Sequence, residues 1–143
     1  MSVKDNKELA KRWFEPQTPP EMANIGKVQD PKAIVEKLVR AGVEEYFSPD
    51  FVLHLPGKQG NRETVIQENV KSISAFPDMI FKLDKMIAEG DMVAVLGRML
   101  VPSRKKEASY MAICRIASGK FVEIWTSADY STSRQRLGIT PEK

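Results

Sequence analysis

Apolar residues recur at helical spacing near the start of the chain. Leu9, Trp13 and Phe14 predict a short helix over residues 5–14, and a following proline ends it. Residues 15–29 contain several prolines and a glycine, a composition typical of a loop. The first thirty residues therefore predict one short helix followed by one long connection.

Two longer amphipathic helices are expected next. Asp30 is a typical N-cap and Pro31 suits the first helical position, so the apolar stripe over 31–47 predicts a helix that begins there. The segment 48–50, Ser-Pro-Asp, is expected to end this helix. Residues 62–75 carry a second apolar stripe and predict the next helix.

From residue 79 onward, the pattern changes to long β runs separated by short turns. The expected strands are 51–56, 79–89, 92–101, 108–117 and 121–130, with a last helical turn over 131–137. Helices that precede an antiparallel meander indicate an α+β fold, with the N-terminal helices packed on a curved antiparallel sheet. Runs of about ten residues exceed the usual strand length of about 5–6, which favours a long, curved sheet.

The last predicted strand carries apolar side chains on both faces. One parity holds Val122, Ile124, Thr126 and Ala128, and the other holds Phe121, Glu123, Trp125, Ser127 and Asp129. A sheet with two apolar faces must be covered twice, by the helices on one side and by a pocket, a partner subunit or both on the other. We expect Glu123, Trp125 and Asp129 to line an apolar pocket with an acid at its edge.

Length and composition limit the class of protein. With 143 residues, the chain is expected to form a single domain over 1–143, with 1–30 as its N-terminal helix and loop. The formal net charge of +3 is small and the basic residues are scattered along the chain, so no nucleic-acid surface is expected. No apolar stretch approaches the ~20 residues of a membrane helix, and no signal core follows the N-terminus, so we expect a cytoplasmic protein without membrane contact.

The motifs of cofactor and metal sites are missing from the sequence. It contains no phosphate-binding loop, no dinucleotide glycine fingerprint and no zinc spacing, so any activity is expected to need neither cofactor nor metal. The single cysteine, Cys114, lies in an apolar run and is expected to be a buried core residue with little thiolate character.

Asp129 and His54 are the candidate catalytic residues. A carboxylate beside an aromatic wall is poorly solvated, which suits a general acid or base near neutral pH. The alternative for Asp129 is a cap on the turn that follows it. His54, the only histidine, could orient a substrate carbonyl or assist proton transfer, or it could serve only as a structural hydrogen-bonding group.

Five further residues are candidates for substrate binding. They are Arg98, Trp125, Glu123, Tyr46 and Tyr110. An arginine among apolar residues either reaches the rim of the sheet or pairs with an acid, and Asp129 would be its partner if it faced the pocket. The tyrosines could donate hydrogen bonds to a bound oxygen or simply form part of the wall.

Several short segments occur in an order that is typical of one family. They are 48–54 (Ser-Pro-Asp-Phe-Val-Leu-His), 76–78 (Phe-Pro-Asp), 87–94, 116–125 with Asp129, and 135–138 (Gln-Arg-Leu-Gly). In this respect the sequence resembles the SnoaL-like polyketide cyclases over roughly residues 31–138. The chain departs from that family over 99–106, where members often carry a Gly-Thr-His-x-Gly stretch and this sequence has no histidine.

The resemblance implies a cone-shaped α+β fold of the nuclear-transport-factor-like superfamily, a pocket inside a curved sheet, and often a homodimer. It also implies that Asp129 acts as general acid/base in an intramolecular aldol ring closure, without metal or cofactor. We therefore expect a cyclase or isomerase-like enzyme that acts on a small, apolar carbonyl compound. A binding protein of the same fold without catalysis, or an interaction domain with a filled core, are the alternatives.

Overall fold

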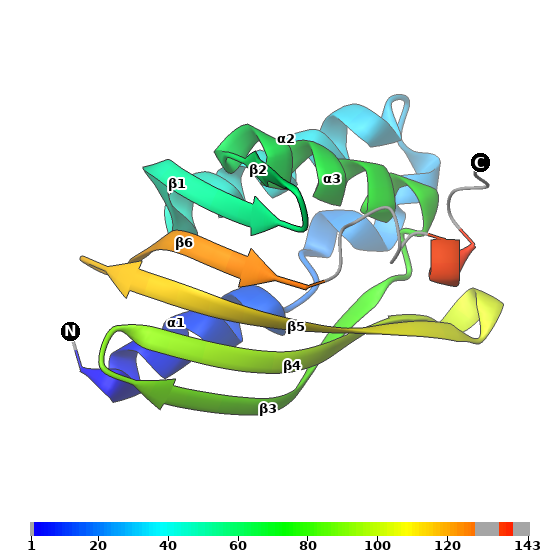
Figure 1. Ribbon diagram of the computed structural model, residues 1–143. Helices are drawn as coiled ribbons and strands as arrows, with labels where there is room; N and C mark the ends of the chain where they lie inside the picture. The colour runs from blue at the N-terminus through cyan, green and yellow to red at the C-terminus, as the bar shows by residue number, and fades with distance from the viewer. Residues whose placement is uncertain (1, 128–134, 139–143) are drawn as a thin grey trace.

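The computed structural model describes residues 2–127 and 135–138 (Figure 1). Its elements in chain order are α1 (Val3–Phe14), the 3₁₀ helix η1 (Pro20–Lys27), α2 (Pro31–Tyr46), β1 (Phe47–Leu55), β2 (Lys58–Gly60), α3 (Arg62–Ala75), β3 (Ile80–Glu89), β4 (Met92–Val101), the short 3₁₀ turn η2 (Pro102–Arg104), β5 (Lys106–Ala117) and β6 (Lys120–Thr126). The predicted terminal turn over 131–137 is described only over 135–137, which are helical.

The six strands form one curved sheet in the order β2-β1-β6-β5-β4-β3. Strands β3 to β6 make the predicted antiparallel meander, and β1 joins β6 in parallel, so the sheet is mixed rather than purely antiparallel. Figure 1 shows α2 and α3 packed together over one side of the sheet, while α1 crosses close to β3 and β4. The predicted α+β class is therefore confirmed.

Helices α2 and α3 begin where the sequence predicts, whereas α1 begins at Val3 instead of residue 5. Asp30 accepts a hydrogen bond from the Ala33 N–H at 3.2 Å, with Pro31 at the first helical position. The end of α2 differs from the prediction, because β1 follows directly at Phe47 and includes the Ser-Pro-Asp segment 48–50. A register shift in the pairing of β1 with β6 over this segment accommodates the proline, which has no N–H to donate.

Aromatic rings form the centre of the core. The Phe47 ring centroid lies 4.7 Å from that of Phe51, 4.8 Å from that of Trp13 and 5.0 Å from that of Phe121. Phe47 and Phe121 are fully buried. This cluster joins α1, the start of β1 and β6, which are distant in sequence, so it fixes α1 against the inner face of the sheet.

A β-bulge in β6 reverses the face on which its side chains point. Ile116 pairs with Phe121, but the preceding Arg115 pairs with Glu123, so one residue of β5 opposes two of β6 and Val122 is the extra residue. Each single-residue shift exchanges the two faces of a strand. Phe121 and Ile124 therefore both face the core, although their parities differ.

The buried cysteine agrees with its predicted role. Cys114 is completely buried on the inner face of β5, and burial raises the pKa of its thiol to about 12. The thiol is therefore a packing group and a poor nucleophile at neutral pH.

Candidate ligand cavity

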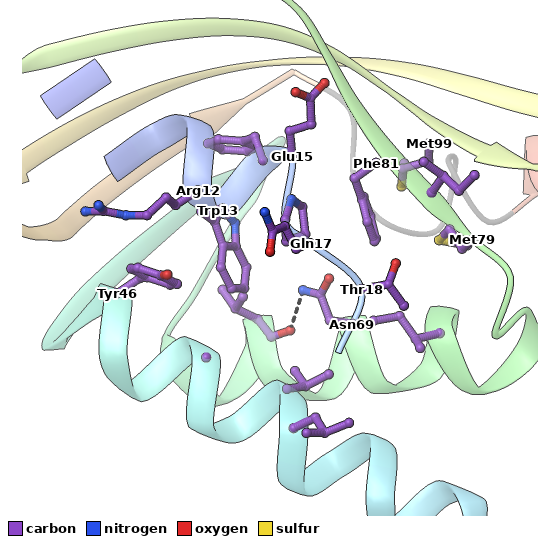
Figure 2. Close-up of a pocket in the computed structure, with 18 of the residues that line it drawn as sticks. Arg12, Trp13, Glu15, Gln17, Thr18, Tyr46, Asn69, Met79, Phe81 and Met99 are labelled. Carbon is purple, nitrogen blue, oxygen red and sulfur yellow. Dashed lines mark hydrogen bonds between the residues drawn. The ribbon is translucent and has the colours of Figure 1, made fainter. Parts of the chain in front are cut away.

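A cavity of about 950 Å³ lies between the helices and the inner face of the sheet. Its walls are mostly apolar, and Figure 2 shows Trp13 and Tyr46 on one side of it and Phe81, Met79 and Met99 on the other. Prominent wall residues are Trp13, Leu38, Leu53, Met79, Phe81 and Met99. This volume is at the upper end of the range typical of sites that enclose a small organic molecule.

A small set of uncharged polar side chains also lines the cavity. They are Gln17, Thr18, Tyr46, Asn69, Tyr110 and Thr126. The charged residues of the lining come from α1 and the residue after it: Glu8, Lys11, Arg12 and Glu15. An apolar chamber with a few hydrogen-bonding groups is suited to a largely apolar ligand that carries one or two oxygens.

Residues 15–19, here called the strap, cross from the end of α1 along the cavity wall (Figure 2). Glu15 anchors the strap, because its Oε2 accepts a hydrogen bond from the Leu83 N–H on the edge strand β3 at 3.0 Å. Two prolines, Pro16 and Pro19, restrict its backbone. The predicted loop thus forms part of the cavity, and its continuation over residues 20–27 is the 3₁₀ helix η1.

The two predicted tyrosines, Tyr46 and Tyr110, both line the cavity. The Tyr46 ring lies edge-on to Trp13 with the centroids 6.2 Å apart. Tyr110 lies across Gly97 of the neighbouring strand, where a Cβ would come within 2.5 Å of the phenolic oxygen. Glycine at this position is therefore what allows Tyr110 to occupy its place beside the cavity.

His54, Glu123 and Trp125 lie on the outer face of the sheet, away from the cavity. His54 Nε2 donates to Glu123 Oε2 at 2.8 Å, Arg115 Nε donates to Glu123 Oε1 at 2.8 Å, and the Trp125 ring stacks on His54 with the centroids 4.9 Å apart. These hydrogen bonds, from His54 first and then Arg115, lower the pKa of Glu123.

This placement corrects the expected face of the last strand. Glu123 and Trp125 were expected to share the pocket face with Phe121, but the bulge at Val122 turns them outward. Ile124 and Thr126 line the cavity in their place. His54 pairs with Trp125 in the ladder and is carried to the outer face with it.

Arg98 also lies on the outer face. Its Nε and one terminal N–H donate to the Asp84 carboxylate at 2.8 and 3.0 Å, and the pair lowers the pKa of Asp84. A register shift in β3 leaves Asp84 as an extra residue opposite β4, within reach of the guanidinium. The arginine therefore pairs with an acid, which was one of the two alternatives, but this acid is Asp84 and not Asp129.

Asp129 lies outside the described residues, so its proposed role remains a prediction. The described part of β6 ends at Thr126, and both Ile124 and Thr126 face the cavity.

Within 2–127 and 135–138, no group of three or more His, Cys, Asp or Glu side chains could hold a metal ion. None of the helices in these ranges is long and apolar enough to span a membrane.

Asn69 is a cavity residue that the sequence interpretation missed. It lies in α3 with Val65 four residues before it and Ile73 four residues after it, and all three line the cavity. A polar residue at helical spacing within an apolar stripe was the available signal. The contribution of Gln17 and Thr18 had no such signal, because the strap has no periodicity.

The sequence matches the model of the SnoaL-like domain over residues 33–124. No curated protein matches the sequence. Among solved structures, a proposed polyketide cyclase from Bacillus cereus ATCC 10987 is 17% identical with a TM-score of 0.64, covering 97% of this chain and 86% of that one. IdmH, a proposed polyketide cyclase from Streptomyces antibioticus, is 25% identical with a TM-score of 0.52, covering 75% of this chain and 92% of that one.

The fold of a designed protein with a curved β-sheet is as similar to this chain as that of the Bacillus cereus protein. It has 16% identity and a TM-score of 0.64, covering 97% of both chains. That protein was made for its shape, so the likeness illustrates that a curved sheet with covering helices does not by itself define an activity. The chemistry of this chain has to be argued from its cavity.

Proposed function

Because the chain belongs to the SnoaL-like family, we propose that it binds a small, largely apolar carbonyl compound and catalyses proton transfer on it. Ring closure by an intramolecular aldol reaction, or isomerisation, is the proposed reaction type. The single observation that supports this most directly is the cavity of about 950 Å³, with apolar walls and a few uncharged hydrogen-bonding groups.

In the proposed mechanism, Asp129 removes a proton from the carbon next to the ligand carbonyl. The resulting enolate attacks a second carbonyl of the same molecule, and the proton then returns to the alkoxide that forms. Hydroxyl and amide donors that line the cavity, such as Tyr46 and Asn69, would stabilise the negative oxygen. The apolar walls would exclude water and strengthen these interactions.

The proposed activity can be tested with an aromatic β-keto ester that carries a second ketone placed for ring closure. The protein, dialysed against EDTA, is incubated with this compound in D₂O and followed by NMR and mass spectrometry. We expect deuterium incorporation at the carbon between the carbonyls and a ring-closed product, both faster than in buffer. Val39→Trp, which fills a cavity wall position, should abolish both. Equal rates with this variant would place the chemistry outside the cavity.

A binding protein without catalysis is the second candidate function. Among the described residues, the carboxylates of the cavity lining are Glu8 and Glu15, and Glu15 is engaged by the Leu83 N–H. The same assay separates the two functions. If the keto ester binds and neither deuterium nor product appears above the buffer rate, the protein is a binding module.

We also propose that a second copy of this chain covers the outer face of the sheet. Ile87, Met111 and Ile113 are 73%, 60% and 46% exposed, and the strand register places all three on this face. An isologous interface needs a surface that complements itself, which an apolar patch does. The Arg98–Asp84 pair lies on the same face and would form part of a polar rim.

Ile113→Glu is expected to convert the proposed dimer to a monomer, because each chain would have to bury an unpaired carboxylate within the apolar patch. Size-exclusion chromatography with light scattering gives the mass, for which one chain is 16.1 kDa. Val3→Glu, at an apolar position on α1 that is 41% exposed, is the matched control and should leave the mass unchanged. A wild-type protein of one-chain mass at micromolar concentration would contradict the proposal.

A further inference from the structure

The carboxamide of Asn69 interrupts the apolar wall that α3 presents to the cavity. Its Nδ2 donates to the Val65 carbonyl oxygen at 2.8 Å, and this bond fixes the orientation of the side chain (Figure 2). A carboxamide has two N–H donors and one acceptor oxygen. Among the described residues, one N–H and the Oδ1 of Asn69 have no hydrogen-bond partner, and both are available to a molecule in the cavity.

The strap brings a second carboxamide to the same region. In Figure 2 the Gln17 side chain lies between Trp13 and Asn69, and Thr18 lies on the other side of Asn69. Gln17 and Asn69 both line the cavity although they are far apart in the sequence. Two carboxamides provide donors and acceptors without net charge, a combination that suits an uncharged oxygen better than a carboxylate or an amine.

The strap is anchored at one end and continues into a helix at the other. Glu15 accepts the Leu83 N–H at 3.0 Å, and Pro19 is the N-cap of η1, where its carbonyl accepts the Met22 N–H at 3.0 Å. The prolines within it reduce the backbone freedom that would be lost when a ligand orders the segment. Gln17 therefore lies two residues from the anchored Glu15, on a backbone whose freedom the two prolines restrict.

We propose that Asn69 and Gln17 form a recognition pole that binds a neutral carbonyl or hydroxyl oxygen at one end of an otherwise apolar ligand. This inference rests on the proposed function and names the residues that set the orientation of the ligand. The ligand oxygen accepts the free N–H of Asn69, and a ligand hydroxyl can donate to either carboxamide oxygen. The ring body of the ligand then lies against the apolar walls.

The test compares 9-fluorenone with fluorene, which share a ring skeleton and differ in one carbonyl oxygen. Quenching of Trp13, which lines the cavity, reports binding in a Trp125→Phe background, since Trp125 is the only other tryptophan and lies on the outer face. We expect Asn69→Leu to weaken fluorenone binding about three- to tenfold, the value of one neutral hydrogen bond, and to leave fluorene binding unchanged or slightly tighter.

Gln17→Leu provides a second variant that removes no core contact, because Gln17 is on the exposed strap; it should weaken fluorenone selectively as well. Gln67→Leu is the matched control and should change neither affinity. Gln67 lies in α3, as Asn69 does, but on the exposed side of the helix, where it bonds to Glu63. Suppose that the wild type binds both compounds and that neither Asn69→Leu nor Gln17→Leu weakens fluorenone binding more than fluorene binding. The proposed recognition pole is then wrong, but the apolar cavity remains a binding site. If the wild type binds neither compound, the pole and the proposed function both fail.

Discussion

Replacing Asp129 by Asn is expected to lower the rate of ring closure or isomerisation by about 10²- to 10⁴-fold, the usual contribution of a general acid/base group. The amide is nearly the same size as the carboxylate but cannot accept a proton from carbon. Ligand affinity should change little, because the walls and the proposed recognition pole remain. The measurement is kcat and KM for a compound that the exchange assay identifies as a substrate.

Asp91→Asn is the matched control, because it makes the same chemical change at an exposed position of the β3–β4 turn that does not line the cavity. It should keep full activity. Circular dichroism and thermal unfolding of both variants exclude a loss of fold. If Asp129→Asn retains the wild-type kcat, proton transfer by Asp129 is excluded, and Glu15 and Glu8 become the carboxylates to test.

Replacing Phe47 by Ala is expected to lower the free energy of unfolding by about 3–5 kcal/mol, the range for a large aromatic residue removed from a packed core. Phe47 is fully buried and contacts Trp13, Phe51 and Phe121 at once. It also lines the cavity, so the void left by the ring can merge with that space instead of collapsing. Urea or guanidinium unfolding monitored by circular dichroism gives the value.

Phe81→Ala serves as the comparison, since Phe81 is a half-buried cavity wall residue on β3. Phe81→Ala should lower the free energy of unfolding by less than Phe47→Ala does, because folding removes less of the apolar surface of Phe81 from water. Should Phe47→Ala prove too unstable to purify, Phe47→Leu retains most of the buried volume and is expected to fall between the wild type and the alanine variant. A loss of less than about 1 kcal/mol for Phe47→Ala would mean that the aromatic cluster does not hold α1 to the sheet.

Local signals predicted most of the elements. The Asp30-Pro31 start of α2 and the range 62–75 of α3 agree with the structure, as does the strand from 92 to 101. Caps, prolines and turn glycines act within a few residues, so they can be read directly from the sequence. The short strand β2 was not predicted, because three residues are too few to show a period.

The candidate site was predicted less well than the fold. Tyr46 and Tyr110 line the cavity as expected, whereas His54, Arg98, Glu123 and Trp125 lie on the outer face. The catalytic assignment of Asp129 is a prediction from the family resemblance, since the residue is outside the described ranges. Sequence reasoning thus located the strand next to the cavity but assigned the wrong side chains of that strand to it.

The sequence by itself determined the order of helices and strands, the α+β class and the family. The order of elements and the class follow from side-chain periodicity, capping residues and turn chemistry, which are local properties, whereas the family follows from the match of the sequence to the SnoaL-like domain. Which face of each strand meets the cavity was decided only by the tertiary structure. The extra residues Val122 and Asp84 bulge where β6 and β3 pair with their neighbours, and a bulge depends on the partner strand. No pattern within a single strand can reveal it.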